Sequence, residues 1–375
     1  MSINDVIIIG AGAAGSAAAF HLANSGKKVI VLEKNLDKFI KPCGGGMASS
    51  VQSLFPFKLN EVVEEIITRV EFTWCLSDPV VANLPGESPF WIVRRENLDT
   101  FLINNAISEG AQLIRPFKVN NLEKKDLTWI VTSEEGVELK SKALIIADGS
   151  NSPWTKLLKI GPKNIHQAST TSVRIEGRGL LEKGTSRFEF GLVHHGFAWA
   201  FPLKDSVNIG VGTFIGNRPA DSKKVLELLL PDLGFNPKEG IRQSSSLRVW
   251  NGHSNLHSDG VVAVGDAASL CDPFLAEGLR PALLSGCEAA YSINNWLEGS
   301  TKDLSNYTKT MKNIWGESMS WGRRISQVFY RFPKIGYQLG VKRPTAPQRI
   351  AEILSGEMGY GDIANRVIKR LLLKR

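Results

Sequence analysis

The chain has 375 residues, about two to three times the length of a typical domain, so we expect two packed units or one large composite. Hydrophobic residues make up 43% of the chain and charged residues 22%, which allows a large core and excludes a disordered, collagen-like or coiled-coil protein. The net charge of +8 is uneven: residues 301–375 hold 15 Lys or Arg and 5 Asp or Glu, a net charge of +10, whereas residues 1–300 sum to −2.

A strand, a glycine-rich turn and a helix follow one another at the start of the chain. The β-branched run at residues 6–9 ends in the turn, an Ala-rich helix follows it, and a second strand is predicted at residues 29–32. The pattern Gly10-x-Gly12-x-x-Gly15 therefore lies inside one βαβ unit. In that position it is the fingerprint of a dinucleotide-binding turn.

Each glycine of this fingerprint has a predicted role. Gly10 permits the tight turn, Gly12 lets the backbone approach a pyrophosphate, and Gly15 lets the helix pack on the strand. A pyrophosphate would bind the free N–H groups at the start of the helix, so the predicted site includes Ala13 and Ala14.

The second strand ends in Glu33, which lies 23 positions after Gly10. A carboxylate at this position can accept hydrogen bonds from both hydroxyls of a ribose. Lys34, the next residue, is included in the predicted site. A glycine-rich turn without a ligand would not require an acid at this spacing.

Residues 41–47 read KPCGGGM, which predicts a loop. Three consecutive glycines let a backbone press against a flat ligand or adopt positive φ angles. A flexible surface loop would have the same composition. Because this loop follows the βαβ unit, we expect it to face the ligand, so Cys43, Gly44 and Gly45 belong to the predicted site.

Strand and helix patterns alternate after this loop. We predict strands at residues 69–75, 90–93, 129–132, 137–139 and 143–147, a helix at 97–109, a strand at 260–264 and a helix at 278–297. Residues 166–255 are rich in strand patterns and show little helical periodicity.

Three apolar strands end in residues that are suited to ligands. Besides the glycine fingerprint, these are Asp148-Gly149 and Gly265-Asp266. Parallel sheets bind ligands at the carboxyl ends of their strands, and a cofactor as long as FAD would use all three ends. Asp266 would accept a hydrogen bond from a ribityl hydroxyl, and the helix that opens near Gly278 would face the flavin pyrimidine edge. Each aspartate alone could also be a simple turn or helix cap.

Taken together, the chain resembles the geranylgeranyl reductase family, within the wider group of FAD-dependent monooxygenase-like flavoproteins. The matching residues are Gly10, Gly12, Gly15, Glu33, the PCGGG loop at 42–46, Arg95, Leu98, Asp99, 147–149, 265–268, Pro273, Glu277, Gly278, Phe332, Pro333, Arg343, Pro344 and 356–360. The PCGGG loop and the last of these segments are more specific to the reductases than the glycine fingerprint. The resemblance covers nearly the entire chain.

The resemblance implies an α/β (α+β composite) fold with three parts. A Rossmann-like FAD-binding domain would comprise residues 1–75, 95–165 and 256–300, and an antiparallel β-sheet substrate domain residues 76–94 and 166–255. Residues 301–375 would form a basic helical region. The resemblance also adds Arg95, Pro273, Gly278 and Leu279 to the cofactor-binding residues.

A substrate-domain motif of the family, PxxYxWxFP, fits residues 194–202 imperfectly, since they read HHGFAWAFP. Phe197 stands where the family has Tyr, so a hydrogen-bond or proton donor is missing. Trp199 and Phe201 keep a hydrophobic wall, although core packing would explain them equally well. His194 and His195 would point to opposite faces of a strand, so at most one would face the site.

The predicted catalytic residues are Cys43, Phe197 and Trp199. The resemblance implies that Cys43 lies beside the flavin, where a thiol could take part in redox chemistry or donate a proton. It could equally be a small packing residue in a tight loop.

The function implied is reduction of carbon–carbon double bonds in an isoprenoid, geranylgeranyl-type chain by hydride transfer from reduced flavin. No second glycine fingerprint is present, so NADPH would bind transiently or another electron donor would act. An alternative is an FAD-dependent monooxygenase or halogenase acting on an apolar or aromatic substrate, because these enzymes share the FAD motifs. A flavin-bearing binding protein without turnover is a second alternative.

The basic C-terminal region contains Trp315, Trp321, Phe329, Tyr330, Phe332 and Tyr337. Basic residues mixed with aromatic residues suit a peripheral contact with anionic lipid headgroups, and a solvated helical cap would fit equally. No nucleic-acid-binding fold accompanies the charge, so nucleic acid is not an expected partner.

The four cysteines, Cys43, Cys75, Cys271 and Cys287, form no CxxC pair and no metal-ligand spacing. The start of the chain has no secretory signal pattern, and residues 6–20 are too short and too rich in glycine for a membrane span. We therefore expect reduced thiols, no metal, and a cytoplasmic protein that could associate peripherally with a membrane surface.

Overall fold

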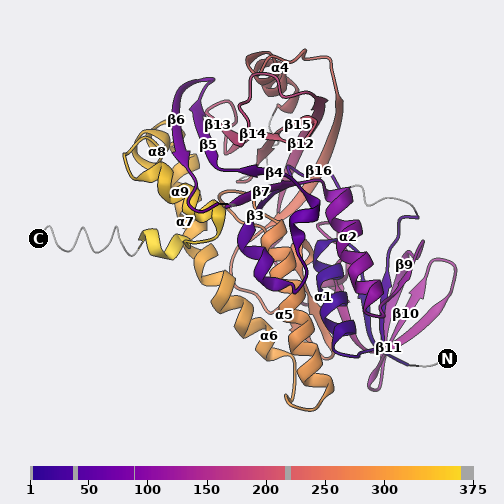
Figure 1. The fold of residues 1–375 in the computed structure, drawn as a ribbon. Coiled ribbons are helices and arrows are strands. Elements are labelled where there is room, and N and C mark those ends of the chain that lie inside the picture. The colour runs from indigo at the N-terminus through magenta and orange to yellow at the C-terminus, as the bar shows by residue number, and fades with distance from the viewer. Residues whose placement is uncertain (1–2, 37–40, 88, 216–220, 365–375) are drawn as a thin grey trace, which may run out of the picture.

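The computed structural model describes residues 3–36, 41–87, 89–215 and 221–364. The described strands form three sheets, with helices packed against them (Figure 1). The largest sheet and its helices lie in the lower half of Figure 1, the second sheet lies above them, and the C-terminal helices lie along the left side. The composite α/β fold predicted from the sequence is confirmed.

Buried parallel strands form the centre of the largest sheet. Within the described residues the strand order is β17-β18-β11-β1-β2-β8, with β10 and β9 added beside β11. The central strand β1 (Asn4–Ile9) pairs in parallel with β11 (Glu138–Ile146) and β2 (Val29–Leu32). Its apolar residues are buried, as expected for a parallel sheet that is covered on both faces. The other strands are β8 (Gln112–Ile114), β9 (Val119–Lys125), β10 (Thr128–Ser133), β17 (His257–Ser258) and β18 (Val261–Ala263).

Three helices pack together beside this sheet. The Ala-rich helix α1 (Ala13–Asn24) contacts both α5 (Leu279–Leu297) and α2 (Arg95–Ser108). The approach to α5 is close, because a Cβ atom at Gly286 would lie 2.3 Å from the carbonyl oxygen of Ala14. All three helices were predicted from the sequence. A short helix, α3 (Trp154–Leu157), follows β11.

The second sheet forms the upper half of the molecule, in the order β16-β12-β15-β14-β13-β5-β6. Its strands are β5 (Arg69–Trp74), β6 (Ser77–Asn83), β12 (His166–Glu176), β13 (Thr185–Phe190), β14 (Gly196–Pro202), β15 (Ser206–Thr213) and β16 (Ile241–Val249). Neighbouring strands are antiparallel, as predicted, except that β13 and β5 run parallel.

One face of the second sheet packs against helix α4 (Ser222–Asp232). Residues 166–255, which show little helical periodicity in the sequence, therefore contain a helix that was not predicted. The buried residues of α4 are Val225, Leu226, Leu229 and Leu230, which have helical spacing but fill only two turns among strand patterns.

A small third sheet consists of β3 (Gly46–Ala48), β7 (Phe90–Val93) and β4 (Val63–Ile67). The predicted loop at residues 41–47 ends earlier than expected, because Gly46 and Met47 already pair with β7. Short 3-10 helices occur at Ser49–Leu54, Leu59–Val62 and Gly265–Ala268.

The predicted domain boundary at residue 75 divides a hairpin. Strand β5, assigned by sequence to the FAD-binding domain, pairs with β13 and β6 and so belongs to the second sheet. Strand β7, assigned to the substrate domain, lies in the small sheet. The other predicted domain boundaries stay predictions.

Helices follow α5 to the end of the described chain. They are α6 (Ser305–Met311), a π-helical turn (Lys312–Gly316), α7 (Glu317–Arg331), α8 (Pro333–Gly340) and α9 (Ala346–Ser355). No helix of the described ranges has the length and apolar character needed to cross a membrane.

Most C-terminal aromatic residues point inward, which agrees better with the helical cap than with lipid contact, the two alternatives that the sequence left open. Trp315, Phe329, Tyr330 and Tyr337 are buried, and Trp321 is half-buried. Of the six predicted residues, Phe332 is the one that is exposed. The rings are buried because the helices pack against the rest of the chain, so this region forms a packed cap.

Candidate active site

A cavity of about 760 Å³ lies between the strand ends of the largest sheet and one face of the second sheet. The predicted site residues that line it are Gly10, Gly12, Ala13, Ala14, Glu33, Lys34, Cys43, Gly44, Gly45, Arg95, Asp148, Gly149, Phe197, Trp199, Asp266, Gly278 and Leu279. Gly15 and Pro273 stand outside the lining. The topology thus gathers segments that are more than a hundred residues apart in sequence.

The glycine turn after β1 has the close contacts that its sequence requires. Gly10 has a φ angle of +104°, and a Cβ atom there would lie 2.5 Å from the carbonyl oxygen of Ala147. A Cβ atom at Gly15 would lie 1.9 Å from the carbonyl oxygen of Gly10, so only glycine lets α1 approach the strand. Helix α1 begins directly after Gly12, and its first N–H groups point out at the cavity end.

The end of β2 presents a buried carboxylate. Glu33 accepts hydrogen bonds from the backbone N–H groups of Ala11, at 3.2 Å, and Asn35, at 2.9 Å. These bonds fix the side chain beside the glycine turn. Carboxylate oxygens have further lone pairs, so Glu33 can still accept hydrogen bonds from a ribose. Lys34 lines the same end of the cavity.

The end of β11 presents Asp148 and Gly149. Atom Oδ1 of Asp148 is buried and has no hydrogen-bond partner among the described residues. Burial raises the pKa of this carboxyl to about 6. Gly149 has a φ angle of +85° with open space where a Cβ atom would be. A polar ligand could therefore both reach this turn and satisfy the unpartnered oxygen.

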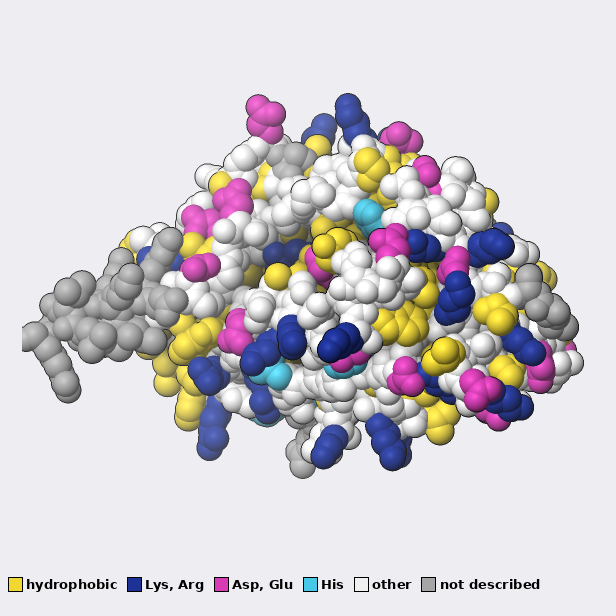
Figure 2. All heavy atoms as spheres, turned by 90° about the horizontal axis from the view of Figure 1, so that it is seen from below, with side chains coloured by type: hydrophobic (Ala, Val, Ile, Leu, Met, Phe, Trp, Pro, Cys, Tyr) yellow, Lys and Arg dark blue, Asp and Glu magenta, His cyan; other side chains and the backbone are white. Residues whose placement is uncertain are grey.

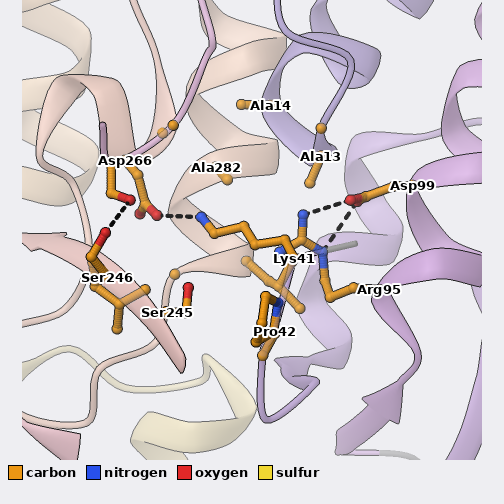
Figure 3. A pocket seen from close by; sticks show the side chains of 18 of the residues that line it. Ala13, Ala14, Lys41, Pro42, Arg95, Asp99, Ser245, Ser246, Asp266 and Ala282 are labelled. Atoms are coloured by element: carbon orange, nitrogen blue, oxygen red, sulfur yellow. Dashed lines mark hydrogen bonds and ion pairs between the residues drawn. The ribbon is translucent and has the colours of Figure 1, made fainter. Parts of the chain in front are cut away.

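Asp266, at the end of β18, is paired with Lys41 across the cavity. The Lys41 ammonium lies 2.6 Å from Oδ2 of Asp266, and the Asp266 side chain is largely buried. Figure 3 shows Lys41 extending from the loop at Pro42 toward Asp266. The sequence predicted Asp266 as a ligand residue but assigned no role to Lys41.

Helix α5 starts at the cavity, where Gly278 and Leu279 form part of the lining. A Cβ atom at Gly278 would lie 3.7 Å from Oδ1 of Asp266, so the helix start and this carboxylate are neighbours. Pro273 lies in the buried loop before the helix, and its predicted cofactor contact stays a prediction.

Arg95 and Asp99 form a buried ion pair on α2. Arg95 donates from Nη2 to Oδ2 of Asp99 at 2.6 Å and from Nε to Oδ1 at 3.2 Å, as Figure 3 shows. Burial opposes the charge of the guanidinium, but the nearby Asp99 carboxylate outweighs it and raises the pKa of Arg95. The pair therefore keeps a fixed positive group in the cavity lining, although the sequence singled out Arg95 alone as a cofactor residue.

The loop before β3 lies between the strand ends of the largest sheet and the face of the second sheet. Gly45 has a φ angle of +83°, and a Cβ atom there would lie 2.2 Å from the carbonyl oxygen of Val93. The Gly45 N–H donates to the Cys43 sulfur at 3.3 Å. Cys43 is half-buried, and its carbonyl oxygen accepts a hydrogen bond from Asn208 at 3.2 Å. The loop is thus tied to the second sheet.

Aromatic rings form the wall that the second sheet contributes. The rings that line the cavity from this sheet are Phe188, Phe197, Trp199, Phe201 and Phe214. They contact one another at centroid distances of 4.8 to 6.3 Å. The Trp199 indole N–H donates to Asn208 at 2.9 Å, and Asn208 in turn holds the Cys43 loop. Trp199 and Phe201 therefore both pack in the sheet and face the cavity.

Glycines in β15 make room for these rings. A Cβ atom at Gly210 would lie 2.1 Å from the Trp199 ring, and one at Gly212 would lie 2.4 Å from the Phe214 ring. Both rings can therefore lie flat over the strand. These glycines have no signature in the sequence, because their contacts are formed across the sheet.

Hydroxyl side chains line the same wall toward its edge. They are Thr170 and Ser172 on β12 and Ser244, Ser245 and Ser246 on β16. Ser246 bonds to Ser150 at 2.9 Å, and Figure 3 shows Ser245 and Ser246 below Asp266. The sequence analysis assigned no role to this group. A run of three serines on a predicted strand was the signal that could have indicated it.

The two histidines of the family motif do not reach the site. They lie between β13 and β14 rather than on a strand, and their rings stack at 3.9 Å. His195 has a φ angle of +60°, and neither histidine lines the cavity. The prediction that adjacent side chains would point to opposite faces is wrong, because the backbone turns at this point.

The residues present fit FAD. The helix start at Ala13 and the acid Glu33 suit a dinucleotide, and Asp148 offers an unpartnered buried oxygen midway along the cavity. Asp266 and the start of α5 suit the flavin end. No group of three His, Cys, Asp or Glu side chains suited to a metal occurs in the described part of the chain.

Comparisons with known proteins agree with this cofactor. Residues 5–39 match the family model described as FAD dependent oxidoreductase. The chain is 28% identical over 376 aligned residues to menaquinone reductase of Mycobacterium tuberculosis, covering 92% of this chain and 89% of that protein. It is 26% identical over 332 residues to digeranylgeranylglycerophospholipid reductase of Methanocaldococcus jannaschii, covering 82% of each.

Solved structures share the fold. A geranylgeranyl bacteriochlorophyll reductase-like protein from Thermoplasma acidophilum matches with a TM-score of 0.79 and 20% identity, over 95% of this chain and 92% of that one. A flavin-dependent brominase matches with a TM-score of 0.72 and 21% identity over the full length of both chains. The chain is therefore an FAD-dependent oxidoreductase that is similar in sequence to menaquinone reductase and digeranylgeranylglycerophospholipid reductase.

Proposed function

We propose that this enzyme reduces carbon–carbon double bonds of an isoprenoid, geranylgeranyl-type chain. The observation that carries the proposal is the aromatic wall of the second sheet, which faces the FAD-binding strand ends across one cavity. Relatives named for reduction of a digeranylgeranyl lipid and of menaquinone support it.

The lining favours an apolar substrate. Of the described lining residues contributed by the second sheet, none carries a charge. An isoprenoid chain would bury its surface against Phe188, Phe197 and Phe201, a gain on the order of 25 cal/mol per Å². A charged head group would lack a partner on this wall, so it would lie outside, whereas the serine hydroxyls of β16 could bind a neutral polar head.

FAD, when bound, supplies the hydride that adds to one carbon of the double bond. Reducing equivalents would come from NADPH or another donor that binds transiently. We assign the chain's own residues three tasks. Phe197 and Trp199 hold the alkene and exclude water, Asn208 fixes the Cys43 loop through the bonds described above, and the Cys43 thiol delivers the proton to the second carbon.

The test is anaerobic reduction of the purified holoenzyme, followed by reoxidation with a panel of isoprenoids. The panel comprises a prenyl diphosphate, an archaeal-type ether lipid, a prenylated quinone and a geranylgeranylated chlorophyll. We expect reoxidation with at least one of them and a product that has gained two hydrogen atoms per reduced bond. Cys43→Ser should slow this reoxidation more than tenfold and leave reduction of the flavin unchanged.

A monooxygenase or halogenase is the alternative function, because a brominase shares the fold. It predicts rapid oxygen consumption coupled to a hydroxylated or halogenated product. That product, with no mass gain from any isoprenoid under anaerobic conditions, would replace the proposed reductase. The proposal also includes peripheral contact with a membrane, because long isoprenoid chains reside in bilayers.

A further inference from the structure

Four apolar side chains lie exposed along the end of α7 and the outer side of α8. Val328 is 68% exposed, Phe332 54%, Ile335 58% and Leu339 55%. Single exposed apolar residues are ordinary on protein surfaces, but a contiguous group marks an interaction site. These four, spaced three or four residues apart, are named the α7–α8 patch.

The patch is not an unfilled part of the core. Phe329 and Tyr337 bury the inner sides of the same two helices, and the Tyr337 hydroxyl donates to the carbonyl oxygen of Phe72 at 3.0 Å. Turning α8 to bury Ile335 and Leu339 would expose Tyr337. The helix therefore has a second, outward apolar side.

Positive charge surrounds the patch. Residues 318–351 contain seven Lys or Arg and no Asp or Glu. Arg324, Arg331, Lys334 and Arg343 are exposed and have no ion-pair partner among the described residues. The neighbouring acid Asp78 is paired with Lys342 at 2.6 Å. Figure 2 shows apolar side chains beside Lys and Arg on the left side of the described surface.

Two layers of aromatic rings separate the patch from the rings that line the active-site cavity. Behind it, Phe329 and Tyr337 contact Phe190, with ring centroids 5.3 and 6.1 Å apart. Phe190 in turn contacts Phe197, which lines the cavity, at 5.9 Å. A surface bound at the patch would therefore sit close to the aromatic wall of the site.

We propose that the α7–α8 patch docks on an anionic lipid bilayer. The four apolar side chains enter the boundary between headgroups and acyl chains, and the unpaired Arg and Lys side chains bind the anionic headgroups. This docking rests on the proposed function, which includes peripheral contact with a membrane, and it names the protein surface that makes this contact. Of the six aromatic residues considered in the sequence, Phe332 alone belongs to this patch, and the other three contacts come from Val328, Ile335 and Leu339.

The test is co-sedimentation of the full-length holoenzyme with vesicles of phosphatidylcholine, with or without one-third phosphatidylglycerol. We expect binding to the anionic vesicles that weakens as salt is raised. Phe332→Ser combined with Ile335→Ser should weaken binding at least tenfold. Arg331→Glu combined with Lys334→Glu should do the same, since each basic residue contributes about fivefold at an anionic surface.

Leu127→Ser and Lys223→Glu are the matched controls, because both side chains are exposed and far from the patch in sequence. They should leave vesicle binding unchanged. Equal flavin content in all variants would show that each one is folded.

Absence of wild-type binding to anionic vesicles at low salt would overturn the proposal. So would an equal loss in the control variants. If size measurement shows a dimer that Phe332→Ser with Ile335→Ser converts to a monomer, and vesicles bind neither form, the patch joins two copies of the chain instead.

The reductase proposal is tested separately, with isoprenoids dissolved in detergent. Patch variants should reduce these substrates at the wild-type rate and lose rate only on substrates held in anionic vesicles. Vesicle binding without reduction of any isoprenoid would refute the proposed reaction and keep the docking surface. Reduction of an isoprenoid without vesicle binding would refute the docking surface and keep the proposed reaction.

Discussion

The strand-end wall of the cavity and the sheet wall opposite it recognise their ligands by different means. The strand ends present backbone N–H groups, tight glycines and the carboxylates of Glu33, Asp148 and Asp266. The second sheet presents aromatic rings and hydroxyl groups without charge in its described lining. We therefore expect the first wall to be specific for FAD and the second to select a substrate by volume and polarity. The two walls meet at the Cys43 loop, where Asn208 joins them.

This difference means that damage to one wall should leave the other wall's ligand bound. Cofactor binding depends on backbone geometry that a single Cβ atom can block. Substrate binding depends on the positions of rings, which substitutions can shift by degrees. The following substitutions test the separation, in order of decreasing effect.

Gly15→Val should have the largest effect, because its side chain would overlap the carbonyl oxygen of Gly10, which lies 1.9 Å from a Cβ atom at this position. We expect loss of bound FAD and a fall in the free energy of unfolding of more than about 3 kcal/mol. Flavin absorbance per protein and denaturant unfolding measure the two effects. Gly340→Ala is the control, since Gly340 has no positive φ angle and a Cβ atom there would make only an ordinary contact of 3.8 Å with the Phe329 ring. Retention of FAD in Gly15→Val would show that the turn is not required.

Gly210→Val should damage only the sheet wall. Its side chain would displace the Trp199 ring, so substrate-dependent reoxidation should slow at least tenfold while FAD stays bound. Ile209→Val, on the opposite face of the same strand, should cost about 1 kcal/mol of stability and leave reoxidation unchanged. If Gly210→Val lost FAD as completely as Gly15→Val, the two walls would not bind their ligands independently.

Asp148→Asn should change how the stability of the flavin-free protein depends on pH. Burial raises the pKa of this carboxyl to about 6, so the folded state holds a proton that the unfolded state releases near pH 4. Wild-type stability therefore decreases as pH rises from about 4 to 6, by on the order of 3 kcal/mol from this group. Asp148→Asn should be more stable than wild type at pH 8 and not at pH 4, as urea unfolding would show. If the free energies of unfolding of the two proteins differ by the same amount at all pH values, the raised pKa does not belong to Asp148.

Trp199→Phe should have the smallest effect. It removes the indole N–H that donates to Asn208 at 2.9 Å, which leaves a buried acceptor unpaired. We expect a loss of about 1 to 2 kcal/mol in stability and a decrease in reoxidation rate below tenfold. If Trp199→Phe and Asn208→Ala have additive effects on stability, the hydrogen bond does not link the two residues energetically.

The strand-end wall could be predicted from the sequence, because its signals are local. Three glycines within six residues and one acid after the next strand pointed to Gly10 and Glu33, and both residues line the cavity. The sheet wall was predicted only through a family motif. Asn208 binds the Cys43 carbonyl across 165 positions, and no local pattern encodes that contact. The sequence could not decide between lipid contact and a cap for the C-terminal rings for a related reason, since Tyr330 and Tyr337 are buried by partners far away in sequence.

The C-terminal helices have a consequence for the order in which the enzyme matures. Their side chains hold the segment that carries Asp266: Tyr307 donates to the carbonyl oxygen of Ala263, Trp315 to that of Leu270, Tyr330 to that of Phe274, and Tyr360 to the Asp272 carboxylate. During synthesis the glycine turn emerges first, whereas the anchors of this segment follow between residues 307 and 360. We therefore expect cofactor loading to be a late step, so a nascent chain stalled at residue 300 should capture FAD far more weakly than the released protein.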